Sequence, residues 1–216
     1  MSELPFANRR AAGRALAKRL LAEVHTEESE TLVLGLPRGG VPVALEVALA
    51  LKAPLDVMVV RKLGVPGHEE FAMGAIASGD VSVLDEALID RLGINAERLQ
   101  SVIDSERREL ARREVAYRGE RPYPDLHGHR VILVDDGIAT GASIRAAIQA
   151  VRRLGAQQLI LAVPVAPADT LKRLASEVDA VVCVATPANF RAVGQWYIDF
   201  DQTTDAEVRA CLTEQQ

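Results

Sequence analysis

Five runs of apolar residues recur along the chain without the alternation that marks a half-exposed strand. They are TLVLGL (31–36), LDVMVVRK (55–62), RVILVD (130–135), QLILAVPV (158–165) and AVVCVA (180–185). Valine, leucine and isoleucine dominate these runs, which is typical of strands buried on both faces of a parallel sheet. The pattern therefore predicts strands in the interior of the protein.

Stretches with helical spacing separate these runs. Between 8 and 24, Ala12, Leu16, Leu20 and Val24 recur on one helical face. The alternation of strand and helix predicts an α/β fold, with a Rossmann-like, mostly parallel sheet flanked by helices. The whole chain is expected to form one domain, 1–216. Further helices are predicted over 41–52, 142–155, around 168–176, and in the tail from 203 onwards.

The long connection after the second run predicts an insertion over about 73–128. AMGAIAS and VSVLD are separated by Gly-Asp, a pair that favours a tight turn, and are predicted to form a hairpin. Residues 85–118 are predicted to be mostly helical, with a break near 92–95. LGVPGHEEF (63–71) shows neither periodicity and is predicted to be a loop. The stretch 185–200 is predicted to be a small hood beside the sheet.

Composition narrows the function classes. The 216 residues carry a net charge of −5, which argues against bulk electrostatic binding of nucleic acid. Two cysteines give no sign of a disulfide framework or a thiolate metal site. The start lacks the apolar segment of a signal peptide, and no apolar run reaches about 18 residues. We therefore expect a cytoplasmic protein that binds neither a membrane nor nucleic acid.

The segment VILVDDGIATGAS (131–143) places adjacent carboxylates, Asp135 and Asp136, where a strand ends. In an open α/β sheet, this end of a strand faces the ligand crevice. Sugar hydroxyls or hydrated Mg²⁺ offset the repulsion between two such carboxylates. The turn that follows supplies Thr140, Ser143 and the N-terminus of a helix, which together favour an anion. These features predict a ribose 5-phosphate site; the alternative is a strand-end turn with a helix cap.

This segment resembles the phosphoribosyl pyrophosphate (PRPP) motif of type I phosphoribosyltransferases. The resemblance implies that Asp135 and Asp136 meet the ribose hydroxyls. The segment departs mildly from the family pattern, because it has alanine at 142 where glycine is common and serine at 143 where threonine is common. The loop implied to hold the 5-phosphate comprises Ile138, Ala139, Thr140, Gly141, Ala142 and Ser143.

A second strand–loop–helix junction, GLPRGGVPVA (35–44), resembles the pyrophosphate loop of the same family. The resemblance implies that backbone amides near Arg38, Gly39 and Gly40 face the leaving pyrophosphate. Taken alone, such a sequence is more simply a tight turn before a helix.

The run 55–62 ends in two cations. The family places a cation after this strand, within reach of PRPP, so Lys62 is the favoured residue and Arg61 the second; solvated strand-end charges are the alternative. Residues 63–71, which include His68, correspond to the mobile catalytic loop of the family, or else to an ordinary surface loop.

The resemblance implies a Mg²⁺-dependent enzyme that transfers the phosphoribosyl group of PRPP to a small nitrogenous acceptor, a nucleobase or a similar molecule, and releases pyrophosphate. Mg²⁺ would arrive with PRPP and meet Asp135 and Asp136 indirectly; a homodimer is expected from the family. Lys62 and the two aspartates are the predicted catalytic residues. The rival hypothesis is a non-catalytic regulator that senses PRPP or a nucleotide. A dinucleotide-binding enzyme is excluded because no G-x-G-x-x-G follows the first strand.

The acceptor is not defined by these motifs. Phe190, Trp196 and Tyr197 lie in the hood and are candidates for stacking on a planar base, or else form a small satellite core. The chain is similar to uncharacterised bacterial phosphoribosyltransferase-domain proteins that share PRGGVPVA, RK-x-G and VGQWY-x-DF, and these bring no acceptor with them.

The segment 105–121 contains many arginines with glutamates between them. Glu109 with Arg113, and Glu114 with Arg118, have the spacing of ion pairs on one helix. We interpret this segment as a solvated helix rather than a surface that binds nucleic acid.

Overall fold

The computed structural model describes residues 4–24 and 30–215, and its centre is a five-stranded parallel sheet. The strand order is β2-β1-β6-β7-β8, so the predicted α/β class is confirmed. The strands are β1 (Thr31–Gly35), β2 (Leu55–Val57), β6 (Arg130–Val134), β7 (Gln158–Val165) and β8 (Ala180–Ala185).

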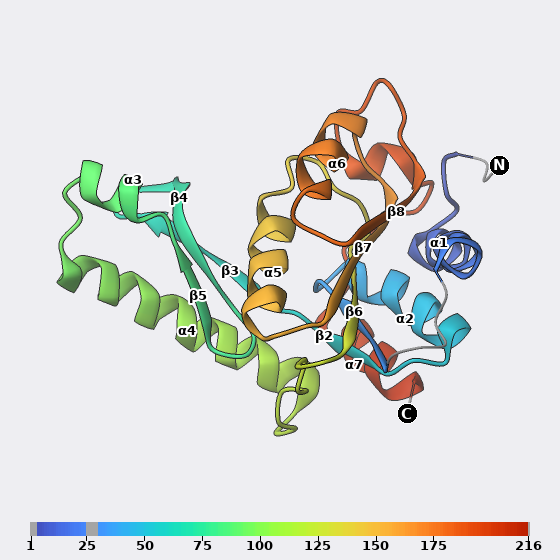
Figure 1. Ribbon diagram of the computed structural model, residues 1–216, viewed down its shortest axis with the longest axis horizontal. Helices are drawn as coiled ribbons and strands as arrows, with labels where there is room; N and C mark the ends of the chain where they lie inside the picture. The colour runs from blue at the N-terminus through green and yellow to red at the C-terminus, as the bar shows by residue number, and fades with distance from the viewer. Residues whose placement is uncertain (1–3, 25–29, 216) are drawn as a thin grey trace.

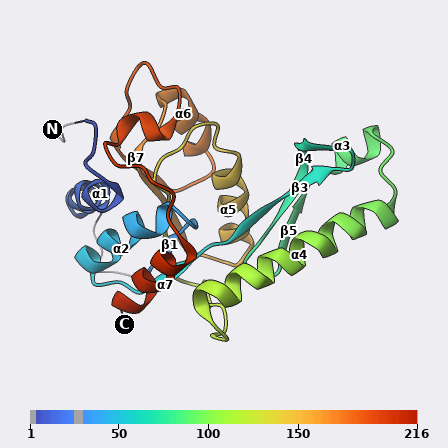
Figure 2. The ribbon, with the colours of Figure 1, turned by 180° about the vertical axis from the view of Figure 1, so that it is seen from behind.

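Helices cover both faces of this sheet (Figures 1 and 2). Alternate residues of β1 separate into two cores, because Val33 packs with α1, α2 and α7 whereas Leu32 and Leu34 pack with α5. The helices are α1 (Arg9–Glu23), α2 (Gly40–Leu51), α5 (Ala142–Arg153), α6 (Ala168–Ala175) and α7 (Asp205–Glu214). The predicted helices are confirmed, with bounds that differ by a few residues.

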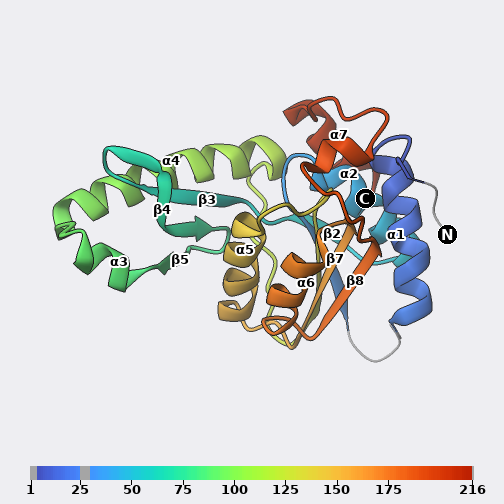
Figure 3. The same ribbon diagram turned by 90° about the horizontal axis from the view of Figure 1, so that it is seen from above.

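The strand order reverses between β1 and β6. The chain leaves β1 for α2 on one face of the sheet and leaves β6 for α5 on the other face (Figure 3). The loops at the carboxyl ends of these neighbouring strands therefore diverge and open a crevice, which is where open α/β sheets bind ligands.

A second sheet and two helices project from the body as an arm (Figures 1 and 3). The predicted hairpin is confirmed: it is closed by Gly79 and Asp80, both with positive φ as a type I′ turn requires. The predicted helical break is also confirmed, since α3 and α4 are separate helices. The arm consists of β3 (Val60–Val65), β4 (His68–Ala77), β5 (Val81–Leu84), α3 (Glu86–Arg91) and α4 (Ala96–Arg118).

Two predictions around this arm are wrong. The run 55–62 is not one strand, because β2 ends at Val57 and β3 joins the other sheet from Val60. Residues 63–71 are not a loop, because β3 and β4 pair antiparallel through most of that range, with the turn near Pro66. The register shifts on either side of Gly64, so this pairing leaves no regular alternation in the sequence.

The C-terminal end of α4 is tied to the body by Arg118. Its Nε and Nη2 lie 2.6 and 3.0 Å from the two carboxylate oxygens of Asp56, the residue in the middle of β2. The predicted pairing of Glu114 with Arg118 is therefore wrong, and Arg118 is buried rather than solvated. The predicted pairing of Glu109 with Arg113 is confirmed, at 2.8 Å. In the described part of the chain, no helix is both long and apolar enough to cross a membrane.

Candidate functional site

The candidate site is formed by the connections that follow three adjacent strands, β2, β1 and β6. The connection after β2 leads into β3 with Lys62, the loop after β1 contains the two glycines, and the loop after β6 begins with the acidic pair. The three segments are far apart in the sequence, and parallel pairing of the strands brings them to one edge of the sheet.

Asp135 and Asp136 lie side by side, and both are partly buried. Burial, the largest cause, and then the charge of Asp136 raise the pKa of the Asp135 carboxyl well above its ordinary value. Burial also raises the pKa of Asp136, although its hydrogen bond with Arg9 opposes this rise. The Nε–Oδ2 distance of that ion pair is 2.8 Å. The acidic pair is thus held in an environment that penalises its charge.

The loop after β1 contacts the acidic pair directly. A side chain at Gly39 would place its Cβ 2.1 Å from Oδ2 of Asp136, and one at Gly40 would lie 2.9 Å from the Cα of Asp135. A side chain at Gly40 would clash with the backbone, whereas one at Gly39 would force the Asp136 carboxylate and Arg9 to shift. The loop and the acidic pair are thus in contact. The peptide between residues 37 and 38 is cis. The side chain of Arg38 turns toward α7, where its Nη1 lies 3.6 Å from Asp205.

The loop implied to hold the 5-phosphate leads into the N-terminus of α5. Gly141 has φ of 86° and precedes the helix, and among the described residues no side chain caps this end. Thr140 and Ser143 are exposed. Ile138 instead is buried, and its amide donates to the carbonyl of Val165 at 3.0 Å, so it anchors the loop from behind. Exposed amides, hydroxyls and the helix dipole make this loop suited to an anion.

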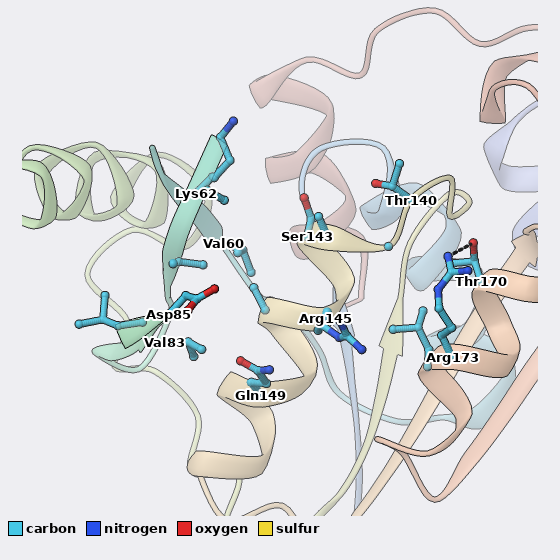
Figure 4. Close-up of a pocket in the computed structure, with 18 of the residues that line it drawn as sticks. Val60, Lys62, Val83, Asp85, Thr140, Ser143, Arg145, Gln149, Thr170 and Arg173 are labelled. Carbon is cyan, nitrogen blue, oxygen red and sulfur yellow. Dashed lines mark hydrogen bonds between the residues drawn. The ribbon is translucent and has the colours of Figure 1, made fainter. Parts of the chain in front are cut away.

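Lys62 and this loop line the same cleft, which has a volume of about 800 Å³ (Figure 4). Lys62 projects from β3 on one wall, while Thr140 and Ser143 lie on the other. Arg61 is not among the residues that line this cleft, and its guanidinium pairs with Glu106 at 2.6 Å. Lys62 therefore shares a cleft with the loop before α5, and Arg61 does not.

The three hood aromatics pack into a small cluster beside the acidic pair. Tyr197 is buried, and its hydroxyl donates to the carbonyl of Asp136 at 2.5 Å. Its ring packs on Phe200, with centroids 4.9 Å apart. Phe190 and Trp196, with centroids 6.2 Å apart, are partly buried at the edge of the cluster. This arrangement corresponds to the satellite core considered in the sequence analysis.

Three residues of the site, Arg9, Thr170 and Arg173, were not found from the sequence. Arg9 holds Asp136 and lies over the ring of Phe200, 4.0 Å from its centroid. Thr170 and Arg173 of α6 support the loop before α5 from behind: the Thr170 hydroxyl donates to the Ala139 carbonyl at 3.1 Å. Arg9 is one of several arginines in α1, and Thr170 belongs to no recognisable motif. The sequence therefore gives no signal that sets these residues apart from their neighbours. His68 lies in a separate, mostly apolar groove at the end of the arm.

No cluster of three or more His, Cys, Asp or Glu side chains able to hold a metal occurs within residues 4–24 and 30–215. Asp135 and Asp136 provide two carboxylates. Mg²⁺ is commonly held by one or two carboxylates together with water and substrate phosphates. The donor set therefore fits a Mg²⁺ ion that is bound jointly with a diphosphate ligand.

The chain belongs to the phosphoribosyl transferase domain family, whose sequence profile matches residues 8–200. Two curated proteins from two strains of Mycobacterium tuberculosis, each named "Putative phosphoribosyl transferase", are 49% identical over 207 residues. That alignment covers 96% of the chain and 46% of each relative. The chain thus spans about half the length of the curated relatives that it matches.

Solved structures support the same fold. A crystal structure of the protein TT1426 from Thermus thermophilus superposes with a TM-score of 0.83 and 41% identity, covering 97% of this chain and 98% of that one. A structure of the AQ2163 protein from Aquifex aeolicus has a TM-score of 0.50 and 12% identity, covering 94% and 85% of the two chains, and so supports the fold alone.

Proposed function

We propose that this protein catalyses the Mg²⁺-dependent transfer of the 5-phosphoribosyl group from PRPP to a small nitrogenous acceptor, such as a nucleobase, with release of pyrophosphate. Membership of the phosphoribosyl transferase domain family supports the general reaction. The observation that carries the proposal is the convergence of an acidic pair, a close-packed glycine loop and an uncapped helix N-terminus at the carboxyl ends of β1 and β6.

Each segment of the site would bind one part of PRPP. The loop from Ile138 to Ser143 would hold the 5-phosphate, Asp135 and Asp136 would accept hydrogen bonds from the ribose hydroxyls, and the amides near Gly39 would face the pyrophosphate. The acidic pair and the loop from Ile138 to Ser143 both follow β6, and the glycine loop follows the neighbouring strand β1. The three segments therefore adjoin one another, which supports their assignment to adjacent parts of one ligand.

The reaction would be a displacement at the anomeric carbon of the ribose. The acceptor nitrogen forms a bond to that carbon while the bond from carbon to the pyrophosphate oxygen breaks. Pyrophosphate leaves with the electron pair, and the acceptor nitrogen releases its proton to water. Lys62 and the glycine loop would stabilise the negative charge that grows on the leaving group. When bound, Mg²⁺ would supply further positive charge to the diphosphate. The catalytic contribution of the protein is then positioning and electrostatics, without a covalent intermediate.

The acceptor site is proposed to lie beside the hood, at 185–200. Tyr197 is occupied by its contacts with Asp136 and Phe200, so the half-buried Phe190 and Trp196 are better placed to contact a planar base. A homodimer, which rests on the family alone, and a cytoplasmic location belong to the same proposal.

Calorimetric titration with PRPP, with and without Mg²⁺, tests this function. We expect Mg²⁺-dependent binding, followed by pyrophosphate release when nitrogenous acceptors are screened. The double variant Asp135→Asn, Asp136→Asn is expected to lose both properties, and full retention of affinity and turnover would disprove the site assignment. Binding without any turnover would favour the rival function, a regulator that senses PRPP or a nucleotide.

A further inference from the structure

The side chain of Arg9, at the start of α1, lies against the acidic pair from outside the motif loops. Its Nε donates to Oδ2 of Asp136 at 2.8 Å, and its Nη1 donates to the carbonyl of Asp201 at 2.6 Å. The guanidinium also covers the ring of Phe200 at 4.0 Å. The side chains of Arg9 and Asp136 are only 13% and 14% exposed. Arg9 is therefore fixed by three different contacts.

The segment after β8 completes this arrangement on the backbone of the same aspartate. The Tyr197 hydroxyl donates to the carbonyl oxygen of Asp136, so both the main chain and the side chain of this residue are held by groups outside its own loop. Tyr197 packs on Phe200, and Phe200 packs on Arg9. The four residues form one connected unit, which we call the Arg9 clamp.

We infer that Arg9 is a positioning residue for PRPP: it fixes the Asp136 carboxylate through Oδ2 so that Oδ1 is presented to the ribose hydroxyls. This inference rests on the proposed function. It concerns a residue of the N-terminal helix, outside both the acidic motif and the glycine loop.

The need for such a residue follows from the position of the acids. Two adjacent carboxylates repel each other when partly buried, and an unrestrained side chain would rotate to separate the charges. Gly39 lies close to the Asp136 carboxylate on one side, since a Cβ added to this glycine would fall 2.1 Å from Oδ2. The positive charge of Arg9 offsets the repulsion between the two carboxylates. Its planar guanidinium donates in a fixed direction and so sets the orientation of the Asp136 carboxylate.

The test compares Arg9→Gln, Arg9→Lys and a matched control, Arg10→Gln. Arg10 is the next residue of α1 and also makes ion pairs between elements, with Glu46 at 3.0 Å and Glu214 at 2.8 Å. The control removes the same charge at nearly the same place in the molecule. It therefore separates the contact with Asp136 from a general loss of positive potential toward the anionic PRPP.

Arg9→Gln is expected to weaken PRPP binding about tenfold or more, because a charge-assisted hydrogen bond to a partly buried carboxylate is lost. The KM for PRPP should rise by a similar factor while kcat changes less than about threefold, since the ribose is held in both the ground and transition states. Arg9→Lys, which keeps the charge, should restore part of the affinity. Arg10→Gln should bind PRPP like the wild type.

Each outcome decides between the two proposals. If the wild-type protein binds no PRPP, the proposed function is wrong and this inference falls with it. If the wild type binds PRPP and Arg9→Gln binds it equally well, or if Arg10→Gln weakens binding as much as Arg9→Gln, only the role of Arg9 is overturned. If Arg9→Gln proves too unstable to assay, Phe200→Leu is the second variant, because it removes the ring beneath Arg9. This variant is expected to raise the KM for PRPP severalfold. An unchanged KM would contradict the inference.

Discussion

Asp135 stands where a carboxylate destabilises the fold. Its pKa is raised by burial and by the charge of Asp136, so the folded protein holds the Asp135 proton more tightly than the unfolded chain does. The folded state is therefore favoured at low pH by this group. That contribution is lost as the pH rises from the unfolded-state pKa, about 4, through the higher folded-state value. At neutral pH the carboxylate costs stability, as expected of a residue retained for binding.

The variant Asp135→Asn tests this cost without reference to any ligand. The amide oxygen can still accept the hydrogen bond from the Asp136 amide, which is 2.8 Å long in the wild type. We expect the variant to be more stable at pH 7.5 by about 1 kcal/mol, or about 3 °C in Tm. The gain should shrink as the pH falls toward 5. A Tm below that of the wild type at pH 7.5, measured by thermal unfolding, would contradict the argument.

Gly39 is the second residue whose identity is fixed by the acidic pair. In Gly39→Ala the added Cβ would lie 2.1 Å from Oδ2 of Asp136, so the loop after β1 and the carboxylate must move apart. We expect PRPP affinity to fall more than about tenfold and Tm to fall by several degrees, the latter from overpacking of about 1–3 kcal/mol. Affinity is measured by calorimetry and stability by thermal unfolding.

The contact between these two residues can be isolated by a double-mutant cycle. In the background of Asp136→Ala, which removes the carboxylate, Gly39→Ala should cost much less stability than it does in the wild type. Equal costs in the two backgrounds would show that the strain arises elsewhere in the loop.

At the scale of elements, α6 is hydrogen-bonded to the loop that is proposed to bind the 5-phosphate. Thr170 donates to the Ala139 carbonyl, and Arg173 donates to the Thr170 hydroxyl at 3.0 Å. Thr170→Val keeps the shape of the side chain but removes the donor. We expect a loss of about 1 kcal/mol in stability and a severalfold weaker affinity for PRPP, because the loop is less well fixed.

Ser176→Ala is the matched control for this variant. Its hydroxyl bonds the Arg173 carbonyl at the other end of α6, at an exposed position away from the loop. PRPP affinity, measured by titration calorimetry, should be unchanged in the control. If Thr170→Val also bound PRPP like the wild type, α6 would have no role in ordering the loop.

The elements differ in how well the sequence predicts them. β6 and β7 are apolar runs buried on both faces, so their composition alone indicates strands. The position of Asp135 at the carboxyl end of β6 can then be predicted as well. β3 could not be predicted in this way, because it joins a small sheet whose register shifts around Gly64. Lys62 was assigned to the site through the family resemblance, and in the structure it lines the cleft beside the loop before α5. Arg9 could not be predicted, since its contact with Asp136 spans 127 residues of sequence.

At the scale of the whole molecule, the arm carries Lys62 and must keep a fixed relation to the body. Arg118 anchors it through Asp56 of β2, and its guanidinium also lies 4.9 Å from the ring centroid of Tyr123. A second link joins α4 to α7, because the Tyr117 hydroxyl donates to Asp205 at 3.1 Å. These contacts connect the arm to the sheet edge on which the site is built.

The anchor at Arg118 gives a prediction for the stability of the whole protein. Arg118→Leu leaves the Asp56 carboxylate without this partner in a position that is only 13% exposed. Breaking a buried pair in this way costs about 3–5 kcal/mol, or a fall in Tm of about 10 °C for a domain of this size. Arg112→Leu, which removes an exposed partner of Glu109 on the same helix, should leave Tm nearly unchanged.

The double variant Asp56→Leu, Arg118→Leu decides whether the pair is needed for stability or for geometry. Apolar replacement of both partners should recover most of the lost Tm, since no buried charge is left unpaired. Turnover with PRPP should recover less than Tm does, because leucines lack the directional bonds that orient the arm and Lys62. Turnover and Tm that recover together would show that the ion pair contributes stability alone, and that the arm is positioned by its other contacts.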